Sequence, residues 1–311
     1  MNLSQLEYII AIDNHRHFVT AAEKCFVTQA TLSMMIKKLE DELGIKIFDR
    51  SKHPVEPTPE GTEVIQRSRL ILAEVQRLKS YAAELEGNIA GELHIGVIPT
   101  LAPYLLPLFL RSFSEKFPDI RLFIKELVTT DIVNKLKTGD LDIGLLATPL
   151  KESQLIEHPL FYEEFFVYAS GSEKLPKKKY LLPRELDPSH LWLLEEGHCL
   201  RNQVINLCEL KTSDAGSDKL HYEAGSIETL INMVDRNDGI TIVPYLAKLL
   251  LKPSQKKNLR EFSKPKPSRE ISLVTAASFP RTKLLKHLKA EIIASVPVEL
   301  LDAGKKLVAE I

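Results

Sequence analysis

Two cysteines nine positions apart stand in a segment of the chain that could carry thiol chemistry. Cys199 lies between His198 and Arg201, at a point where a helix is expected to begin, and Cys208 follows. A neighbouring cation and a helix N-terminus both stabilise a thiolate, which is the reactive form of cysteine. The pattern therefore favours attack by Cys199 on a peroxide.

The spacing of these cysteines places a condition on any bond between them. On one continuous helix, nine residues span about 13.5 Å and the two side chains point in roughly opposite directions. A disulfide needs Cα atoms within about 7 Å of each other. Both conditions hold only if residues 199–208 rearrange on oxidation, which would make the segment a two-state element. A pair of buried core thiols is the alternative.

Other polar residues could complete a peroxide pocket. Thr100 follows an expected strand, where an α/β crevice binds ligands, and its hydroxyl could orient the peroxide or the displaced water. Thr129 or Thr130 could act likewise. The nine histidines show no metal-ligand spacing, so neither a metal nor another cofactor is expected. Cys25, far from this segment in the sequence, is expected to be a small buried core residue.

The region that must position these residues begins near residue 92, where apolar strands alternate with helices. The predicted strands are Leu93–Ile98, Ile120–Glu126, Leu141–Leu146, Phe165–Ala169, Trp192–Leu194, Ile240–Val243 and Ile271–Thr275. The predicted helices are Leu105–Lys116, Asp131–Thr138, Ile227–Arg236 and Pro280–Ala294. About 200 residues with this alternation predict an α/β effector region of two small sheets with a cleft between them. Lys174–Lys179 and Pro253–Pro267 are interpreted as basic surface loops.

The first 60 residues show a different pattern, of short helices in close succession. Thr20 with Glu23 has capping-box spacing and predicts the start of a second helix at Thr20, and Thr28 is expected to open a third. The turn between them predicts a helix-turn-helix, in which Leu32 and Ile36 hold the core.

A helix that opens at Thr28 would present its first turns to the major groove of DNA. The candidate base-reading residues are Thr28, Gln29, Thr31 and Ser33, and Gln29 has the geometry to pair with adenine. Four basic residues could contact phosphates and fix the register on DNA: Lys37, Lys38, Arg50 and Lys52, the last two in an expected wing.

Charge alone does not predict DNA binding. The chain has 41 Lys and Arg against 42 Asp and Glu, and residues 1–60 hold seven basic and nine acidic side chains. The affinity of a single module should therefore be modest, and pairing of two half-sites should matter. Positions 64, 68, 71, 75, 78, 82 and 85 form a heptad seam, apolar at six of seven positions. The seam predicts a helix that pairs with a copy of itself, or alternatively one that packs on its own chain.

Four segments carry a resemblance to a known family. Residues 21–40 resemble the winged helix-turn-helix of LysR-type regulators. Gly197-His198-Cys199-Leu200-Arg201, together with residues 93–107 and 226–234, is similar to the OxyR group of peroxide sensors within that family. The resemblance implies a mainly α winged helix-turn-helix domain and a long linker helix ahead of two Rossmann-like subdomains of periplasmic-binding-protein type.

The resemblance also implies roles for individual residues. Cys199 would be the peroxidatic and Cys208 the resolving cysteine of a disulfide switch, and Arg269 would reach the thiol pocket beside His198 and Arg201. Position 202 departs from the group, because Asn202 stands where an aspartate is usual, and the loss of a carboxylate beside the thiol could change proton transfer or peroxide affinity.

Domains and partners follow from the same comparison. The expected domains are 1–60 for DNA binding, 61–88 for dimerisation and 92–300 for redox sensing, with subdomain I at about 92–164 and 269–300 and subdomain II at about 165–268. The expected partners are double-stranded DNA, hydrogen peroxide, three further copies in a dimer of dimers, and RNA polymerase.

Two classes of protein are disfavoured by the sequence, and two alternatives stay open. No run of about 18 uncharged apolar residues occurs and the N-terminus lacks a signal-peptide pattern, so a cytoplasmic protein without a membrane span is expected, rather than a secreted solute-binding protein. A LysR-type regulator with a small-molecule inducer in its cleft and incidental thiols is one alternative. A thiol peroxidase is the other, although it would leave the helix-turn-helix unused.

Overall fold

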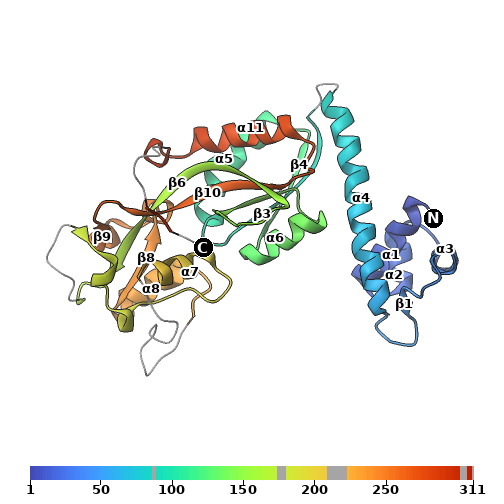
Figure 1. Cartoon of the computed structure of the whole chain (residues 1–311), viewed down its shortest axis with the longest axis horizontal. Helices are drawn as coiled ribbons and strands as arrows, with labels where there is room; N and C mark the ends of the chain where they lie inside the picture. Colours follow the sequence, from blue (N-terminus) through green and yellow to red (C-terminus); the bar gives the residue numbers. More distant parts are fainter. Residues whose placement is uncertain (86–88, 174–179, 209–222, 302–306, 310–311) are drawn as a thin grey trace. The chain divides into compact units, whose positions relative to one another are not determined.

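The structure is a computed structural model that describes residues 1–85, 89–173, 180–208, 223–301 and 307–309 (Figure 1). Its contacts divide the chain into two units, Met1–Asn88 with Thr138–Asp140, and the remainder from Ile89 onward. The predicted fold class, a mainly helical winged helix-turn-helix region ahead of an α/β region, is confirmed. Among the described residues, no helix combines the length and apolar character needed to cross a membrane.

The first unit is a winged helix-turn-helix. Its elements are α1 (Leu3–His15), α2 (Phe18–Lys24), α3 (Gln29–Leu43), β1 (Phe48–Asp49), β2 (Glu56–Pro57) and α4 (Pro59–Leu85). Thr28 caps α3 as predicted, because its hydroxyl accepts a hydrogen bond from the amide of Thr31 at 3.1 Å. Leu32 and Ile36 are fully buried in the core of this unit. The antiparallel pair β1 and β2 forms the wing.

Two predictions for this unit are wrong. α2 begins at Phe18 and its N-cap is His17, whose ring nitrogen accepts from the amide of Thr20, so Thr20 already lies inside the first turn. Histidine is a rare cap, which is why the Thr20 and Glu23 spacing was the stronger signal. Cys25 is half-buried rather than buried, and desolvation together with nearby Glu7 raises the pKa of its thiol.

The heptad seam lies on the long helix α4, which extends about 40 Å at 1.5 Å per residue. In the first half of the helix, Ser68 is buried and its hydroxyl donates to the carbonyl of Val64. Further along, seam residues Ile71, Leu78 and Leu85 are 42%, 68% and 64% exposed. The seam thus leaves three apolar side chains at seven-residue spacing in contact with water.

The second unit is built on one continuous sheet. Its helices are α5 (Ala102–Lys116), α6 (Thr129–Thr138), α7 (Cys199–Leu207), α8 (Ile227–Asn237), α9 (Tyr245–Leu249), α10 (Pro253–Lys256) and α11 (Thr282–Ser295), with short 3-10 turns at Pro183–Glu185, Pro188–His190 and Val298–Leu300. Its strands are β3 (Gly91–Val97), β4 (Ile120–Glu126), β5 (Ile143–Thr148), β6 (Leu155–Ala169), β7 (Tyr180–Leu181), β8 (Ile240–Pro244), β9 (Leu259–Phe262), β10 (Pro267–Ala276) and β11 (Leu307–Val308).

The sheet joins two lobes through its longest strand. The order is β4-β3-β5-β10-β6-β9-β7, with β8 added to β6 and β11 to β10. The first part of β6 pairs with β10, and its last five residues pair with β8. In Figure 1, α5 and α11 lie on one side of the first lobe and α6 on the other. Gly96 and Gly144 allow α6 to approach closely, because a Cβ at either position would lie within 3.1 Å of an Ile132 side-chain atom.

Three sequence predictions in this unit need correction. The strand predicted at Phe165–Ala169 begins ten residues earlier, at Leu155, so the two expected sheets are continuous. Trp192–Leu194 forms no strand; isolated bridges at Leu191 and Leu194 replace it. The loop expected at Pro253–Pro267 contains α10 and β9. The other predicted loop, Lys174–Lys179, lies outside the described residues.

One glycine at the start of α4 provides a test of the packing in the first unit. A Cβ at Gly61 would lie 2.0 Å from the carbonyl oxygen of Ile47, whose backbone is held by the amide of Thr58 at 3.0 Å. We expect Gly61→Ala to lower the free energy of unfolding by at least about 1–3 kcal/mol, even though alanine is the better helix former. Urea unfolding of the purified protein measures the change. Exposed Glu60 supplies the control, since Glu60→Ala should be close to neutral, and a stabilised Gly61→Ala protein would contradict the close contact.

Candidate functional site

Cys199, whose side chain is buried, is the first residue of α7. The preceding residue, His198, is the N-cap, and the two are 3% and 5% exposed. Gly197 turns the chain into the helix with φ +94°, a conformation that residues with a Cβ rarely adopt. His198 Nε2 lies 3.5 Å from a carboxylate oxygen of Glu195. Cys199 therefore sits at a helix N-terminus beside a histidine, as predicted from the sequence.

Cys208 lies at the opposite end of the same helix. It is the C-cap of α7 and its amide bonds to the carbonyl of Val204 at 3.0 Å. At 1.5 Å per residue, nine residues separate the two Cα atoms by about 13.5 Å, so both cysteines are free thiols here. Burial raises the pKa of the Cys208 thiol to about 11, so this thiol is protonated at neutral pH.

Thr100 and Arg269 meet in the interior of the second unit. Arg269 Nη1 donates to the hydroxyl of Thr100 at 2.9 Å, and Nη2 donates to its carbonyl oxygen at 3.1 Å. The guanidinium is fully buried, and its charge is neutralised by Glu163, which accepts from Nε at 2.8 Å and from Nη2 at 2.7 Å. The other oxygen of Glu163 accepts from the amide of Leu246 at 2.7 Å. Arg269 thus holds Thr100 through both its hydroxyl and its carbonyl oxygen.

Thr129 begins α6, and its neighbour Val128 lies beside the turn that leads into α7. A Cβ at Gly197 would be 3.5 Å from the Val128 side chain, so the N-termini of α6 and α7 lie close together. Within the described residues, the hydroxyl oxygen of Thr129 is buried without a hydrogen-bond partner. Buried hydroxyls are nearly always satisfied, so this one is available to a small polar ligand. Thr130 is exposed.

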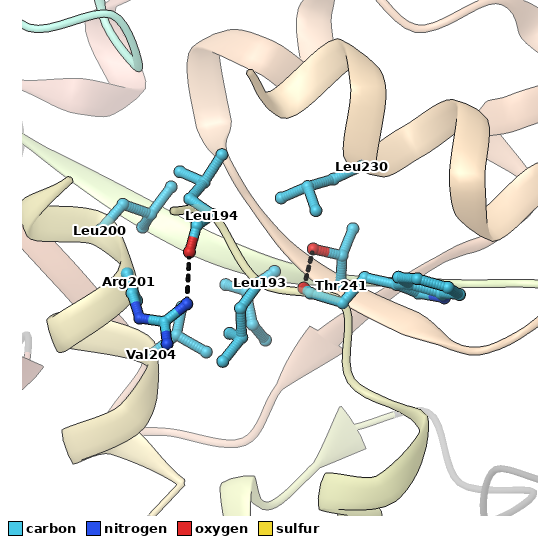
Figure 2. A pocket seen from close by; sticks show the side chains of 9 residues that line it. Leu193, Leu194, Leu200, Arg201, Val204, Leu230 and Thr241 are labelled. Carbon is cyan, nitrogen blue, oxygen red and sulfur yellow. Dashed lines mark hydrogen bonds between the residues drawn. The ribbon is translucent and has the colours of Figure 1, made fainter. Parts of the chain in front are cut away.

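Arg201 and Asn202 occupy different surroundings. Arg201 Nη1 donates to the carbonyl of Leu194 at 2.7 Å and pairs with Glu223 at 3.1 Å, which anchors the first turn of α7 to the lobe beneath it (Figure 2). Asn202, next along the helix, is exposed. Behind α7 lies a cavity of about 10 Å³, room for about one water molecule, lined in part by Leu200, Arg201 and Val204.

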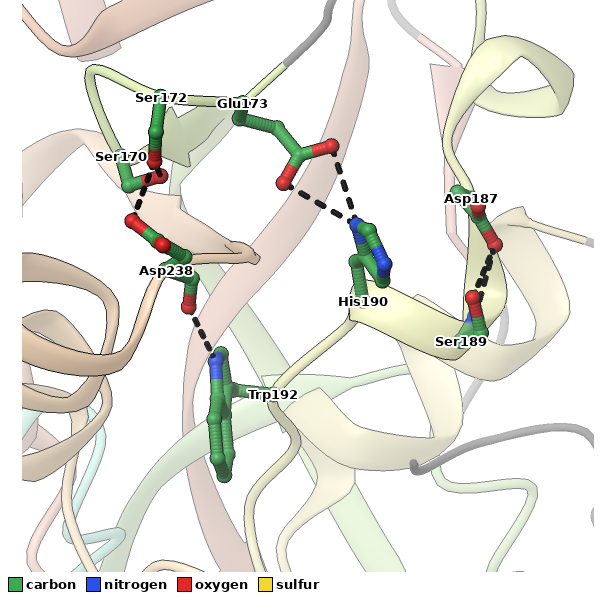
Figure 3. A network of polar contacts seen from close by, with 8 residues as sticks. All are labelled: Ser170, Ser172, Glu173, Asp187, Ser189, His190, Trp192 and Asp238. Carbon is green, nitrogen blue, oxygen red and sulfur yellow. Dashed lines mark hydrogen bonds and ion pairs between the residues drawn. The ribbon is translucent and has the colours of Figure 1, made fainter. Parts of the chain in front are cut away.

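The chain that leads to α7 is held by a separate polar network (Figure 3). His190 Nδ1 lies 3.2 Å from both carboxylate oxygens of Glu173, and the indole of Trp192 donates to the carbonyl of Asp238 at 2.8 Å. Gly239 follows Asp238 with φ +94°, and a Cβ there would lie 2.6 Å from the carbonyl oxygen of His190. These contacts fix the segment before α7 without involving either thiol.

The DNA-facing candidates lie at the start of α3. Thr28, Gln29 and Thr31 are exposed and Ser33 is half-buried. Lys37 and Lys38 are exposed as well. The two wing candidates have acidic neighbours, because Arg50 pairs with Glu40 at 3.0 Å and Lys52 pairs with Glu56.

The structure thus brings some of the predicted residues together and separates others. Thr100 contacts Arg269 directly, His198 adjoins Cys199, and Thr129 begins the helix next to α7, whereas Asn202 faces away. Sequence reasoning missed Glu163, the partner of Arg269, and Gln203, which is buried in the middle of α7. The signal for Glu163 was a pair of glutamates inside the apolar run Phe161–Ala169. In the part of the chain that the structure describes, no group of three potential metal ligands is found.

Comparison with known proteins identifies the class. Residues 3–62 match the bacterial regulatory helix-turn-helix of the lysR family, and residues 86–296 match the LysR substrate binding domain. The chain belongs to the LysR family of DNA-binding transcription regulators. Within that family it falls in the OxyR group. It is 37% identical over 282 residues to the hydrogen peroxide-inducible genes activator of Haemophilus influenzae, covering 90% of this chain and 92% of that protein.

Solved structures agree with this assignment. A full-length OxyR from Pseudomonas aeruginosa, with a cysteine replaced by aspartate, is 33% identical with a TM-score of 0.76, covering 95% of this chain and 99% of that one. A Corynebacterium glutamicum OxyR with a cysteine replaced by serine and hydrogen peroxide bound is 28% identical with a TM-score of 0.62, covering 94% and 92%.

The buried ion pair generates a prediction with a control in the next residue. Glu163→Gln leaves the fully buried charge of Arg269 unpaired, so we expect a loss of about 3–5 kcal/mol in the free energy of unfolding. Glu164→Gln removes a partly exposed pair with Lys266 and should cost less than about 1 kcal/mol. Urea unfolding of both variants measures the difference, and equal losses would show that the Arg269 charge is not dependent on Glu163.

The raised pKa of Cys208 predicts how this thiol reacts. With a pKa of about 11 in the folded chain against 9.0 ordinarily, its thiolate fraction at pH 8 should be about 100-fold lower than in the unfolded chain. Alkylation of Cys208 by iodoacetamide in native Cys199→Ser protein should be slower by at least that factor, and should accelerate as the pH rises toward 11. Mass spectrometry of the Cys208 peptide gives both rates, with urea-unfolded protein as the control. Similar rates in the two states would rule out the shift.

Proposed function

We propose that this regulator senses hydrogen peroxide through reversible formation of a disulfide between Cys199 and Cys208. The observation that carries the proposal is the placement of two buried thiols at opposite ends of one nine-residue helix. The names of the relatives and the peroxide bound to the Corynebacterium protein support the choice of oxidant.

The chemistry has two balanced steps. The Cys199 thiolate attacks one peroxide oxygen, the O–O bond breaks, and a sulfenic acid forms on sulfur while hydroxide leaves and is protonated to water. Cys208 then attacks the sulfenic sulfur, an S–S bond forms, and a second water leaves with the thiol proton. Two thiols are oxidised by two electrons in total, and one peroxide is reduced to two waters.

Each residue of the pocket has a part in this proposal. The Thr129 hydroxyl, which lacks a partner within the described residues, hydrogen-bonds the peroxide, and the Thr100 hydroxyl, held by Arg269, is a second hydrogen-bonding group for it. His198 stabilises the thiolate from the N-cap position. Arg201 acts through its bonds to Leu194 and Glu223, which hold the helix that carries the thiol. Asn202, being exposed, contributes little to peroxide binding.

The switch follows from distance. Cα atoms about 13.5 Å apart cannot support a disulfide, which needs about 7 Å or less, so α7 must unwind at least in part when the bond forms. Because α7 packs on the second lobe, the rearrangement alters the surface of the effector region. That change is the signal in this proposal.

DNA recognition and assembly complete the proposed function. Thr28, Gln29, Thr31 and Ser33 read bases, while Lys37, Lys38, Arg50 and Lys52 contact phosphates. The exposed seam of α4 at Ile71, Leu78 and Leu85 is buried against a second copy, and two such dimers form a tetramer. RNA polymerase is the proposed transcriptional partner and the cytoplasm the proposed location. The thiols react once per signal rather than turning over peroxide. The proposed regions are those expected from the sequence: 1–60 for DNA binding, 61–88 for dimerisation and 92–300 for redox sensing.

A second candidate function has one observation in its favour. A half-open pocket of about 300 Å³ lies beside the N-terminus of α6. Its lining is Thr129, Thr130, Val133, Asn134, Pro149, Leu150, Lys151 and Glu152. That volume is at the lower end of the range for small-molecule sites. In this alternative a small metabolite is the inducer and the thiols are incidental.

The deciding experiment is disulfide mapping after exposure to stoichiometric hydrogen peroxide. We expect a peptide linking Cys199 to Cys208 in the wild-type protein. Cys208→Ser should stop at a sulfenic acid on Cys199 that a dione probe traps. Cys199→Ser should form neither the disulfide nor the trapped sulfenic acid. Cys25→Ser is the matched control and should behave as wild type. If Cys199 and Cys208 stay reduced while the protein still binds DNA, the sensor hypothesis fails. Regulation by a small-molecule inducer is then the better explanation.

A further inference from the structure

The last described residues of the chain add a strand to the sheet close to the thiol helix. β11 pairs in parallel with the start of β10, with Leu307 opposite Pro267 and Val308 opposite Ser268. The next amide, that of Ala309, donates to the carbonyl of Ser268 at 2.8 Å, and Ala309 is buried. This segment, Leu307–Ala309, is called the C-terminal strand below.

The C-terminal strand is bonded to α7 as well as to the sheet. Gln203 Nε2 donates to the carbonyl oxygen of Ala309 at 3.2 Å. Gln203 is fully buried, and among the described residues its Oε1 has no hydrogen-bond partner. A buried amide that is only half satisfied depends strongly on the bond it has, because its loss would leave both ends of the amide unpaired in the interior.

The position of Gln203 within α7 makes this bond sensitive to the redox state. Gln203 lies four residues after Cys199 and five before Cys208, in the middle of the segment that a disulfide must remodel. If the ends of the helix come together by unwinding its central turn, Gln203 leaves Ala309. The bond therefore belongs to the thiol form.

The C-terminal strand also lies beside the residue that holds Thr100. Its backbone bonds go to Ser268, and the next residue of β10, Arg269, donates to Thr100. One short piece of β10 thus holds the C-terminal strand by its backbone and the pocket threonine by its side chain.

We propose that the C-terminal strand is a latch that holds α7 in its helical thiol form, and that Gln203 is the positioning residue that engages it. The proposal rests on the disulfide switch proposed above and adds its regulation. An interaction made in one state only shifts the equilibrium by its whole free energy, so the latch sets how readily the disulfide forms. A strand that merely stabilised the sheet would support both redox forms equally.

The test compares full-length protein with two truncations and one substitution. A chain that ends at Lys306 lacks the latch, and a chain that ends at Glu310 keeps it and serves as the matched control. Gln203→Leu removes the amide but leaves the C-terminal strand. Each protein is equilibrated in glutathione buffers, and the ratio of Cys199–Cys208 disulfide to free thiols is measured by mass spectrometry.

Loss of one buried hydrogen bond should shift the equilibrium roughly tenfold toward the disulfide, which lowers the reduction potential by about 30 mV for a two-electron couple. The chain ending at Lys306 and Gln203→Leu should show similar shifts, and combining them should add little, because both remove the same interaction. The chain ending at Glu310 should remain within about twofold of full length.

Hydrogen exchange of the α7 amides in the fully reduced protein separates failure of the latch from failure of the switch. Both latch variants should exchange roughly tenfold faster at α7 than full length, whether or not a disulfide can form. If full-length protein never forms the disulfide, the proposed switch is wrong, and the exchange rates still decide the latch. Unchanged exchange, or equal destabilisation of reduced and oxidised protein in urea, would overturn the latch. Gln203→Leu keeps the test open if the chain ending at Lys306 does not fold.

Discussion

A nine-residue helix keeps its ends about 13.5 Å apart, and a disulfide needs Cα atoms within about 7 Å, so α7 cannot be both helical and cross-linked. Because the two states exclude each other, the contacts that keep α7 helical decide which state the second unit adopts. A helix of nine residues is too short to be stable alone, so it persists through tertiary contacts. Those contacts include the hydrogen bonds of Arg201 to the Leu194 carbonyl and of Gln203 to the Ala309 carbonyl. They also include the burial of both cysteines, Leu200 and Val204 in the core. His198 offers α7 no side-chain cap, whereas Ser226 caps α8 by accepting from the amide of Thr229.

By contrast, the surroundings of Thr100 are fixed. The fully buried pair of Arg269 and Glu163 joins β10 to β6 and continues to the amide of Leu246, which is the second residue of α9. Breaking such a pair leaves an unpaired buried charge, so the pair keeps one arrangement. Thr100 is bonded to that arrangement through both its hydroxyl and its carbonyl. A fixed Thr100 together with a helix that can rearrange is the combination that the proposed two-state thiol switch requires, because the peroxide must be oriented reproducibly while the thiol-bearing segment remains free to move.

Local signals in the sequence predicted much of this architecture. Patterns a few residues long predict three features: the cap at Thr28, the strand at Ile120–Glu126 and the start of helix α7 at the first cysteine. The structure reproduces the strand residue for residue. What failed depended on distant partners. The first ten residues of β6 were missed because Pro159 and three glutamates interrupt the apolar pattern. In the structure Glu163 is buried opposite Arg269, which neutralises its charge. Gln203 gave no signal, since its partner Ala309 is 106 residues away and is defined by a strand of two residues.

The charge of the helix-turn-helix bears on how tightly it can bind DNA. The helix-turn-helix carries more acidic than basic side chains, and in its wing Arg50 and Lys52 are engaged by Glu40 and Glu56. Phosphate contacts therefore compete with internal ion pairs, which keeps the affinity of one module low. With weak modules, binding depends on how two of them are spaced, and in the proposed assembly a change in the effector region would alter that spacing. A strongly basic module would bind DNA in either redox state. The modest charge of this domain is thus what would allow a change as small as the unwinding of α7 to be read at the DNA.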